Sequence, residues 1–143
     1  MTTTKQAVGK ILMTVAAVIY GFIPPFADFN QTHAENPLWP GHARFHVVWQ
    51  VIITFGVSLL GLYLLWTKKT EKDFSIKISF ILGLIVLGGF LSNATITHLY
   101  GGALSDPNGV PPIFANIDAN LFIFSIGFVF LLAGYFMTKL KTK

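Results

Sequence analysis

Three of the chain's four histidines fall within one short segment, THAENPLWPGHARFH, which begins at Thr32. His42, His46 and Trp49 are spaced as i, i+4 and i+7, so a helix would carry them on one face. Two imidazoles one helical turn apart can bind a single metal ion or a single polar group of a substrate. Histidine also suits proton transfer, because its pKa lies close to physiological pH. The segment therefore predicts a metal-binding or proton-transferring site.

Other groups that can bind a metal ion accompany this segment, and imidazole with carboxylate suits zinc, iron or copper. The set that we predict to form a metal site consists of His42, His46, His98, His33, Asp28 and Glu35. The chain has no cysteine, which excludes thiolate sites and iron–sulfur clusters. Haem is a less favoured alternative because no attachment motif is present, and a metal-free polar pocket is the other.

Polar and aromatic residues nearby are the candidates for binding a substrate or another ligand: Asn36, Trp39, Arg44, Trp49, Asn93 and Asp118. Pro37 and Pro40 stiffen the chain on either side of Trp39, which makes this stretch a candidate lid over the histidines. Anchoring of Trp39 among lipid head groups is the alternative. Asp118 is also expected to cap the helix that follows it.

The composition shows which elements must position these residues. Hydrophobic residues make up 53% of the 143 residues and charged residues only 11%, far from the composition of a soluble domain. Four apolar runs each come near the ~20 residues with which a helix crosses a bilayer. We expect one all-α transmembrane domain, 1–143, a four-helix bundle with helices at 8–25, 43–66, 78–99 and 118–138 and outer loops at 26–42 and 100–117. Polar groups near the ends of these spans are expected to face the bundle interior, which places the site between the second, third and fourth helices.

Lysines set the predicted orientation. Lys5 and Lys10 precede the first helix, four lysines lie between the second and third helices, and three follow the fourth. Cytoplasmic loops collect Lys and Arg, so both termini and residues 67–77 are predicted to be cytoplasmic and the histidines to lie outside. This is the layout of a multi-pass protein of a bacterial-type inner cell membrane, in contact with membrane lipid. The net charge of +4 comes from these anchors, and no basic stripe with interleaved aromatic residues indicates a nucleic-acid partner.

The string DFNQTHAENPLWPGHARFH, from Asp28 to His46, resembles the signature D-x-N-x-T-H-x-x-N-P-x-W-x-x-H-A-x-F-H of a family of small, uncharacterised four-span membrane proteins. The resemblance covers this loop and the start of the next helix, with the four-helix layout in support. It implies no activity, but it marks positions to test: Asp28, Asn30, Thr32, His33, Asn36, Trp39, His42 and His46. The helix count is also similar to that of DoxX-like and sterol-isomerase-like membrane proteins, an analogy of fold alone.

The sequence is consistent with two classes of function. An integral membrane enzyme would hold a metal at the histidines and act on a lipid-soluble small molecule that enters sideways. A non-catalytic binding or accessory subunit would use Trp39, Phe45 and Trp49 to dock a ligand or a partner, as a homo-oligomer or within a larger membrane complex. Whether the protein is an enzyme stays open at this stage.

Overall fold

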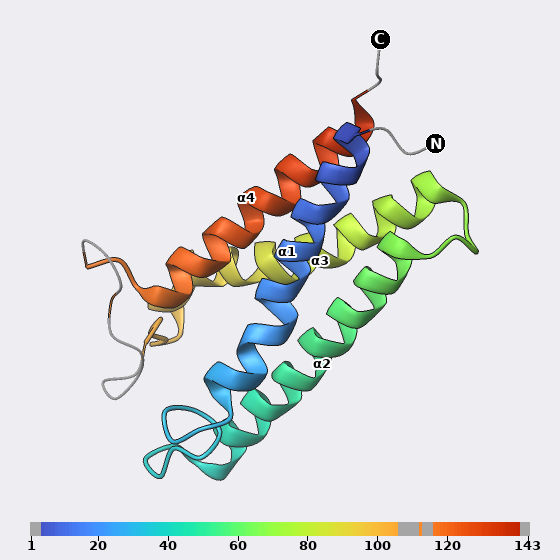
Figure 1. Cartoon of the computed structure of the whole chain (residues 1–143). Helices are drawn as coiled ribbons and strands as arrows, with labels where there is room; N and C mark the ends of the chain where they lie inside the picture. The colour runs from blue at the N-terminus through green and yellow to red at the C-terminus, as the bar shows by residue number, and fades with distance from the viewer. Residues whose placement is uncertain (1–3, 106–111, 113–115, 141–143) are drawn as a thin grey trace.

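The computed structural model describes residues 4–105, 112 and 116–140, and it consists of four long helices (Figure 1). Their bounds are α1 Thr4–Asp28, α2 Gly41–Trp66, α3 Lys72–Ile96 and α4 Ala119–Lys139, and a short 3₁₀ helix, η1 Thr97–Leu99, follows α3. No β-strand occurs among the described residues. The predicted all-α fold with four helices is therefore confirmed, whereas half of the predicted outer loop 100–117 (106–111 and 113–115) lies outside the described residues.

Two helices extend beyond the apolar runs from which they were predicted. Helix α3 begins at Lys72 instead of at 78, because a helix can continue past the bilayer with charged residues in its first turn. Helix α1 contains Pro24 and Pro25 and continues to Asp28 instead of ending near 25. Prolines remove two helical donors, but membrane helices tolerate them because neighbouring groups satisfy the freed carbonyls.

All four helices are long and apolar enough to cross a membrane, with mean hydropathies between 1.8 and 2.2. Large apolar side chains nevertheless remain exposed on their outward faces, such as Phe45, Ile52, Ile85 and Phe136. A soluble protein rarely exposes this much contiguous apolar surface. Contact with membrane lipid accounts for these faces.

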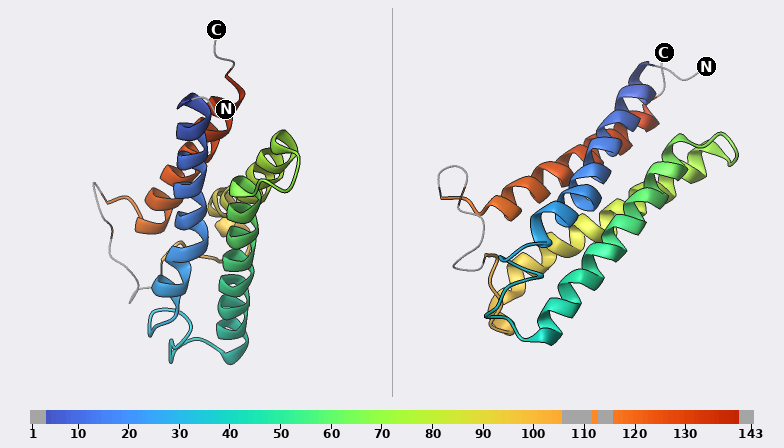
Figure 2. Two further views of the ribbon diagram at one scale, coloured as in Figure 1. Left: turned by 45° about the vertical axis from the view of Figure 1, so that its right-hand side comes forward. Right: turned by 60° about the horizontal axis from the view of Figure 1, so that its bottom comes forward.

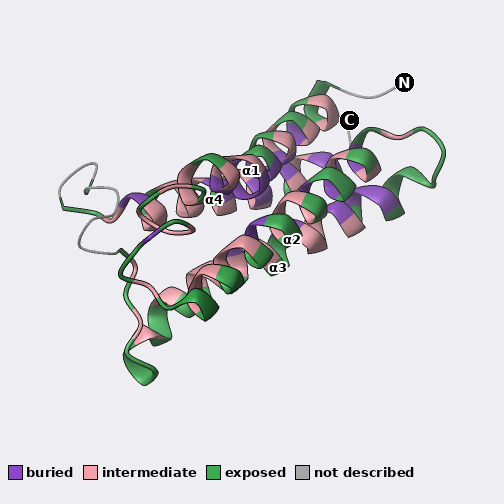
Figure 3. Ribbon diagram, turned by 90° about the horizontal axis from the view of Figure 1, so that it is seen from below, coloured by how far each residue is buried: buried purple, intermediate pink, exposed green. Residues whose placement is uncertain are grey.

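The buried core lies mainly in the half of the bundle formed by the start of α1, the end of α2, the start of α3 and the end of α4, which we call the terminal half; it includes Met13, Leu65, Ile76 and Leu131 (Figure 3). Gly9 and Gly134 bring the backbones of α1 and α4 together: a Cβ atom added to either would lie 2.6 Å from the carbonyl oxygen of the other. Between α1 and α2, the hydroxyl of Ser58 donates a hydrogen bond of 2.8 Å to the carbonyl of Ala17. Small residues thus allow the close helix contacts that are usual in membranes.

Side chains also tie the helices together at the tip of the terminal half. The ammonium of Lys10 lies 4.3 Å from the centre of the Trp66 ring, and the indole nitrogen of Trp66 donates to the hydroxyl of Thr14 at 2.9 Å. Lys139 and Asp73 form an ion pair of 3.8 Å between α4 and α3. The lysines at this end therefore bind aromatic and acidic groups of neighbouring helices.

The helices diverge toward the opposite end, which we call the cavity half. In the views of Figures 1 and 2, the starts of α2 and α4 lie well apart, and the connection between α1 and α2 folds beneath the bundle. This divergence opens the space in which the site is found.

Candidate functional site

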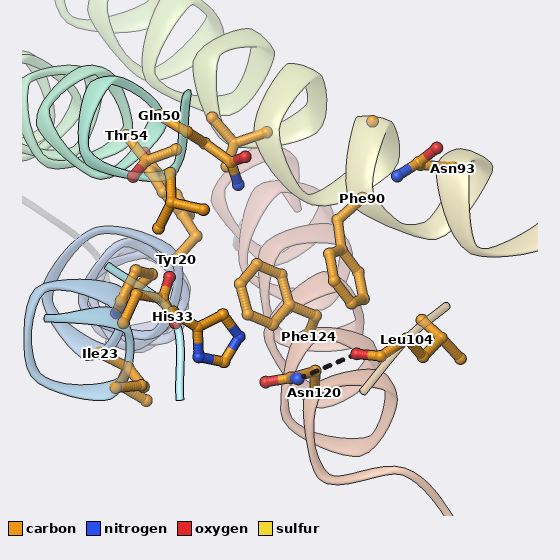
Figure 4. A pocket seen from close by; sticks show the side chains of 16 residues that line it. Tyr20, Ile23, His33, Gln50, Thr54, Phe90, Asn93, Leu104, Asn120 and Phe124 are labelled. Atoms are coloured by element: carbon orange, nitrogen blue, oxygen red, sulfur yellow. Dashed lines mark hydrogen bonds between the residues drawn. The ribbon is translucent and has the colours of Figure 1, made fainter. Parts of the chain in front are cut away.

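A cavity of about 420 Å³ lies in the cavity half, lined by all four helices and by both connections at this end. Its walls are largely apolar and include Phe90 and Phe124, whose rings stack with centroids 4.2 Å apart. The polar residues that line it include Asp28 and five that Figure 4 labels: His33, Gln50, Thr54, Asn93 and Asn120. A cavity of this size, apolar with a few convergent polar groups, is typical of a small-molecule site.

The connection 29–40 is folded around Asn30. Its side-chain oxygen accepts hydrogen bonds from the backbone nitrogen of Thr32 at 2.8 Å and from the Thr32 hydroxyl at 2.6 Å. Its side-chain nitrogen donates to the carbonyl of Ala27 at 2.9 Å, which ties the turn to the end of α1. Asparagine is favoured in such turns because its side chain bonds to the backbone two residues further on.

This turn also determines which nitrogen of His33 can carry the proton. The hydroxyl of Thr32 lies 2.7 Å from Nδ1 of His33, but its single proton is already donated to Asn30. This arrangement favours the tautomer in which Nδ1 donates to the Thr32 hydroxyl. In neutral His33, Nε2 is then an acceptor, and the structure gives it no hydrogen-bond partner among the residues described. Figure 4 shows the ring reaching into the cavity.

Asn36 and Trp39 hold the rest of the connection against His33. Asn36 is fully buried; its side chain donates to the carbonyl of Thr32 at 3.2 Å and accepts from the backbone nitrogen of Leu38 at 3.0 Å. The Trp39 ring meets the His33 ring edge to face, with centroids 5.4 Å apart. The connection is therefore ordered around His33 by its own side chains, as a site on a loop requires.

Some of the other polar side chains at the cavity form hydrogen bonds to described residues, and others do not. Asn93 accepts a hydrogen bond of 2.7 Å from the hydroxyl of Tyr100, and Asn120 donates one of 3.4 Å to the carbonyl of Leu104. Asp28, the last residue of α1, uses its backbone carbonyl in the loop, while its carboxylate makes no hydrogen bond or ion pair within the described part of the chain and has His33 as its electrostatic neighbour. Asp28 and His33 thus retain unused acceptors at the cavity.

His42 and His46 lie on a different surface. Their Nε2 atoms are 3.0 Å apart, but both side chains are exposed, on the same face of α2 as the exposed rings of Phe45 and Trp49. The residues of α2 that line the cavity occupy another face: Val47, Gln50 and Thr54. The histidine face of this helix, which we expected inside the bundle, is thus not found at the cavity, which other residues of α2 line.

The six residues predicted to bind a metal are therefore dispersed. Asp28 and His33 line the cavity, His42 and His46 lie on the exposed face of α2, His98 is exposed in η1, and Glu35 is exposed in the connection. No three His, Asp or Glu side chains in the described ranges come close enough to hold a metal ion. The arrangement offers no support for a site built from the predicted set, and binding of zinc, iron, copper or haem stays a prediction.

The sequence profile of one protein family, a family of unknown function named DUF6640, matches residues 12–116. The chain belongs to the DUF6640 family. No curated protein matches the chain. No solved structure matches it either, so the analogy with DoxX-like and sterol-isomerase-like folds stays unconfirmed.

The DUF6640 match spans the segment in which the cavity's polar groups are concentrated. It covers the whole connection 29–40 as well as Asp28, Gln50 and Asn93, whereas Asn120 and Phe124 of α4 lie beyond it. The family profile therefore includes the element that carries His33 and three of the four helices that form the cavity.

The residues predicted to bind a ligand in this DUF6640 chain have separate structural positions. Asn93 lines the cavity, and Asn36 and Trp39 order the connection, while Arg44 and Trp49 do not line the cavity. The predicted cap at Asp118 is confirmed, because its carboxylate accepts from the backbone nitrogens of Asn120 and Leu121 at 2.9 and 3.0 Å. A role in ligand binding stays a prediction for this set.

Sequence reasoning missed several lining residues, among them Tyr20, Gln50, Thr54 and Asn120. One signal was present: Gln50 and Thr54 are one helical turn apart and interrupt an otherwise apolar run. Polar side chains within a membrane span usually face the protein interior. This pair therefore indicates the inward face of α2 better than the nearby histidines do.

Proposed function

We propose that the protein binds a small lipid-soluble molecule in the cavity, with its apolar part against Phe90 and Phe124 and its polar end toward Asp28 and His33. The observation that carries the proposal is the combination of apolar walls with two unused acceptors at one end of the cavity. Apolar surface provides the free energy of binding, and a few placed polar groups fix the orientation of the ligand. Neither requires a bound metal.

Proton transfer by His33 is a second candidate function, and the Asn30–Thr32–His33 chain of hydrogen bonds favours it. A histidine held with its proton on Nδ1 can use Nε2 as a general base toward a ligand hydroxyl. Thr32 would then act as a positioning residue. His33→Gln should abolish turnover of such a ligand while leaving its binding measurable, whereas a purely binding protein would show no turnover in either form.

We also propose, from the placement of the lysines, that both termini and residues 67–77 are cytoplasmic, which puts the cavity half at the outer face of a cell membrane. A cysteine introduced at Ser105 should react with an impermeant thiol reagent in intact cells, and one introduced at Thr70 should not. If only Thr70→Cys were labelled, the orientation would be the reverse of the one that we propose.

Gly89 provides the means to test ligand binding. It lies on the same stripe of α3 as Val86, Phe90 and Asn93, all of which line the cavity, and a Cβ atom there would meet no other atom within 4 Å. Gly89→Leu should therefore place an apolar side chain in the cavity, starting from a Cβ position that is free of contacts. Gly56 of α2 also has no atom within 4 Å of such a Cβ but does not line the cavity, so Gly56→Leu is the matched control.

The probes are tritiated decanol and tritiated decylamine. Each is added to the protein in lipid nanodiscs, the nanodiscs are captured, and the radioactivity that stays with them is counted. The wild type and Gly56→Leu should retain at least one probe above the level of empty discs, and Gly89→Leu should not. Equal retention by all three proteins would show that the probes only partition into lipid and would refute the proposed function.

A further inference from the structure

Charge distinguishes the ligands that the cavity can accept. Asp28 is the one acidic residue among its described lining residues, and no Lys or Arg lines it. Neither an ion pair nor a hydrogen bond to the Asp28 carboxylate is formed within the described ranges. An ionised carboxylate that is partly desolvated without a partner is unfavourable, and a bound cation offsets that cost.

The second unused acceptor lines the same cavity as the first. Asp28 and His33 are near enough to interact electrostatically, and both line the cavity. When His33 is neutral with Nδ1 donating to Thr32, its Nε2 is an acceptor that faces the cavity. Two acceptors, one of them anionic, match a ligand that carries a positive charge and more than one N–H donor.

We propose that the ligand is a lipophilic amine bound as its ammonium ion, which donates one hydrogen bond to the Asp28 carboxylate and another to Nε2 of His33. This inference rests on the proposed function. The alkyl part of the amine then occupies the apolar space between α3 and α4.

Ligands with other polar end groups would satisfy Asp28 and His33 less well than an ammonium ion does. A carboxylic acid would place a second negative charge beside Asp28. An alcohol has one donor and leaves either Asp28 or His33 without a partner. A quaternary ammonium carries the charge but cannot donate a hydrogen bond to either acceptor.

Four probes with the same alkyl chain test these distinctions: decylamine, decanol, decanoic acid and decyltrimethylammonium. Their retention is measured on nanodiscs carrying the wild type, and the retention by Gly89→Leu is subtracted to remove partitioning into lipid. We expect decylamine to bind about tenfold more tightly than decanol, because hydrogen bonds to charged groups are the stronger ones. Decyltrimethylammonium should bind more weakly than decylamine, and decanoic acid should show no specific retention.

Two substitutions of similar size assign the preference to its residue. Asp28→Asn should reduce decylamine binding to the level of decanol and leave decanol binding unchanged. Glu35→Gln removes an exposed carboxylate of the same connection that does not line the cavity, and it should keep the full preference. If Glu35→Gln abolished the preference instead, the amine would be attracted by surface charge and not by the cavity.

The outcomes separate this inference from the proposed function. If no probe binds the wild type more than Gly89→Leu, both are refuted. If decanol binds as tightly as decylamine, or if the preference for decylamine survives in Asp28→Asn, the cavity binds small molecules but the amine inference is refuted.

Discussion

The terminal half and the cavity half of the bundle differ in whether all their polar side chains are paired within the protein. In the terminal half, hydroxyls donate to helix carbonyls: Ser58 bonds to Ala17, and Thr138 bonds to Tyr135 at 2.6 Å. In the cavity half, Asp28 and His33 present acceptors to an open space. Polar groups that bond within the bundle stabilise it, whereas groups left unpaired at a cavity can bind a ligand.

Glycine shows the same contrast. Gly9 and Gly134 allow two backbones to touch, so neither position has room for a side chain. Gly89 has open space where its side chain would be. One residue type therefore allows close packing in the terminal half and contributes open volume in the cavity half.

The largest expected effect comes from adding a single methyl group at these glycines. Gly134→Ala would place a Cβ atom 2.6 Å from the Gly9 carbonyl oxygen and 2.8 Å from Cγ of Met13. Such overpacking should lower the free energy of unfolding by about 1–3 kcal/mol. Gly89→Ala should leave it unchanged or raise it by up to about 1 kcal/mol, because alanine is the better helix former. Unfolding in mixed detergent micelles measures both, and equal destabilisation would contradict the contrast between the halves.

A smaller effect is expected at the connection that carries His33. Asn36→Ala removes two hydrogen bonds made by a fully buried side chain and leaves the amide of Leu38 without its partner. The local stability of residues 29–40 should fall by about 1–2 kcal/mol. Hydrogen exchange of the backbone amides in this range reports the change. Glu35→Ala, at an exposed neighbouring position, is the control, and similar exchange in the two variants would show that Asn36 does not order the connection.

The smallest effect compares an acidic residue from each half. Asp118→Ala removes the cap of α4, and losing such a cap costs about 1 kcal/mol. Asp73→Ala removes only an exposed ion pair of 3.8 Å to Lys139, and the free energy of unfolding should barely change. Thermal unfolding of both variants in the same detergent shows which substitution causes the larger loss of stability. A larger loss for Asp73→Ala would mean that the ion pair contributes more than its geometry indicates.

Local signals were the ones that predicted structure correctly. Four apolar runs indicated four helices, and the position of Asp118 before such a run indicated a cap; the structure shows both. These features depend on residues close together in the chain. The histidine site failed to form as predicted because it required contacts between helices, which the spacing of His42, His46 and His98 does not specify.

The sequence by itself determined the helices, their membrane-spanning character and which residues share a helical face. Only the tertiary structure decided which face of each helix turns inward: Val47 and Thr54 of α2 line the cavity, whereas His42 and His46 of the same helix do not. The physical reason is the solvent. In water an apolar stripe marks the buried face of a helix, but lipid is as apolar as the bundle interior, so both faces can be apolar and the pattern does not tell them apart. Close packing at small residues such as Gly9 and Gly134 determines which helix faces turn inward. The cavity, with His33 at its edge, results from this arrangement of the helices.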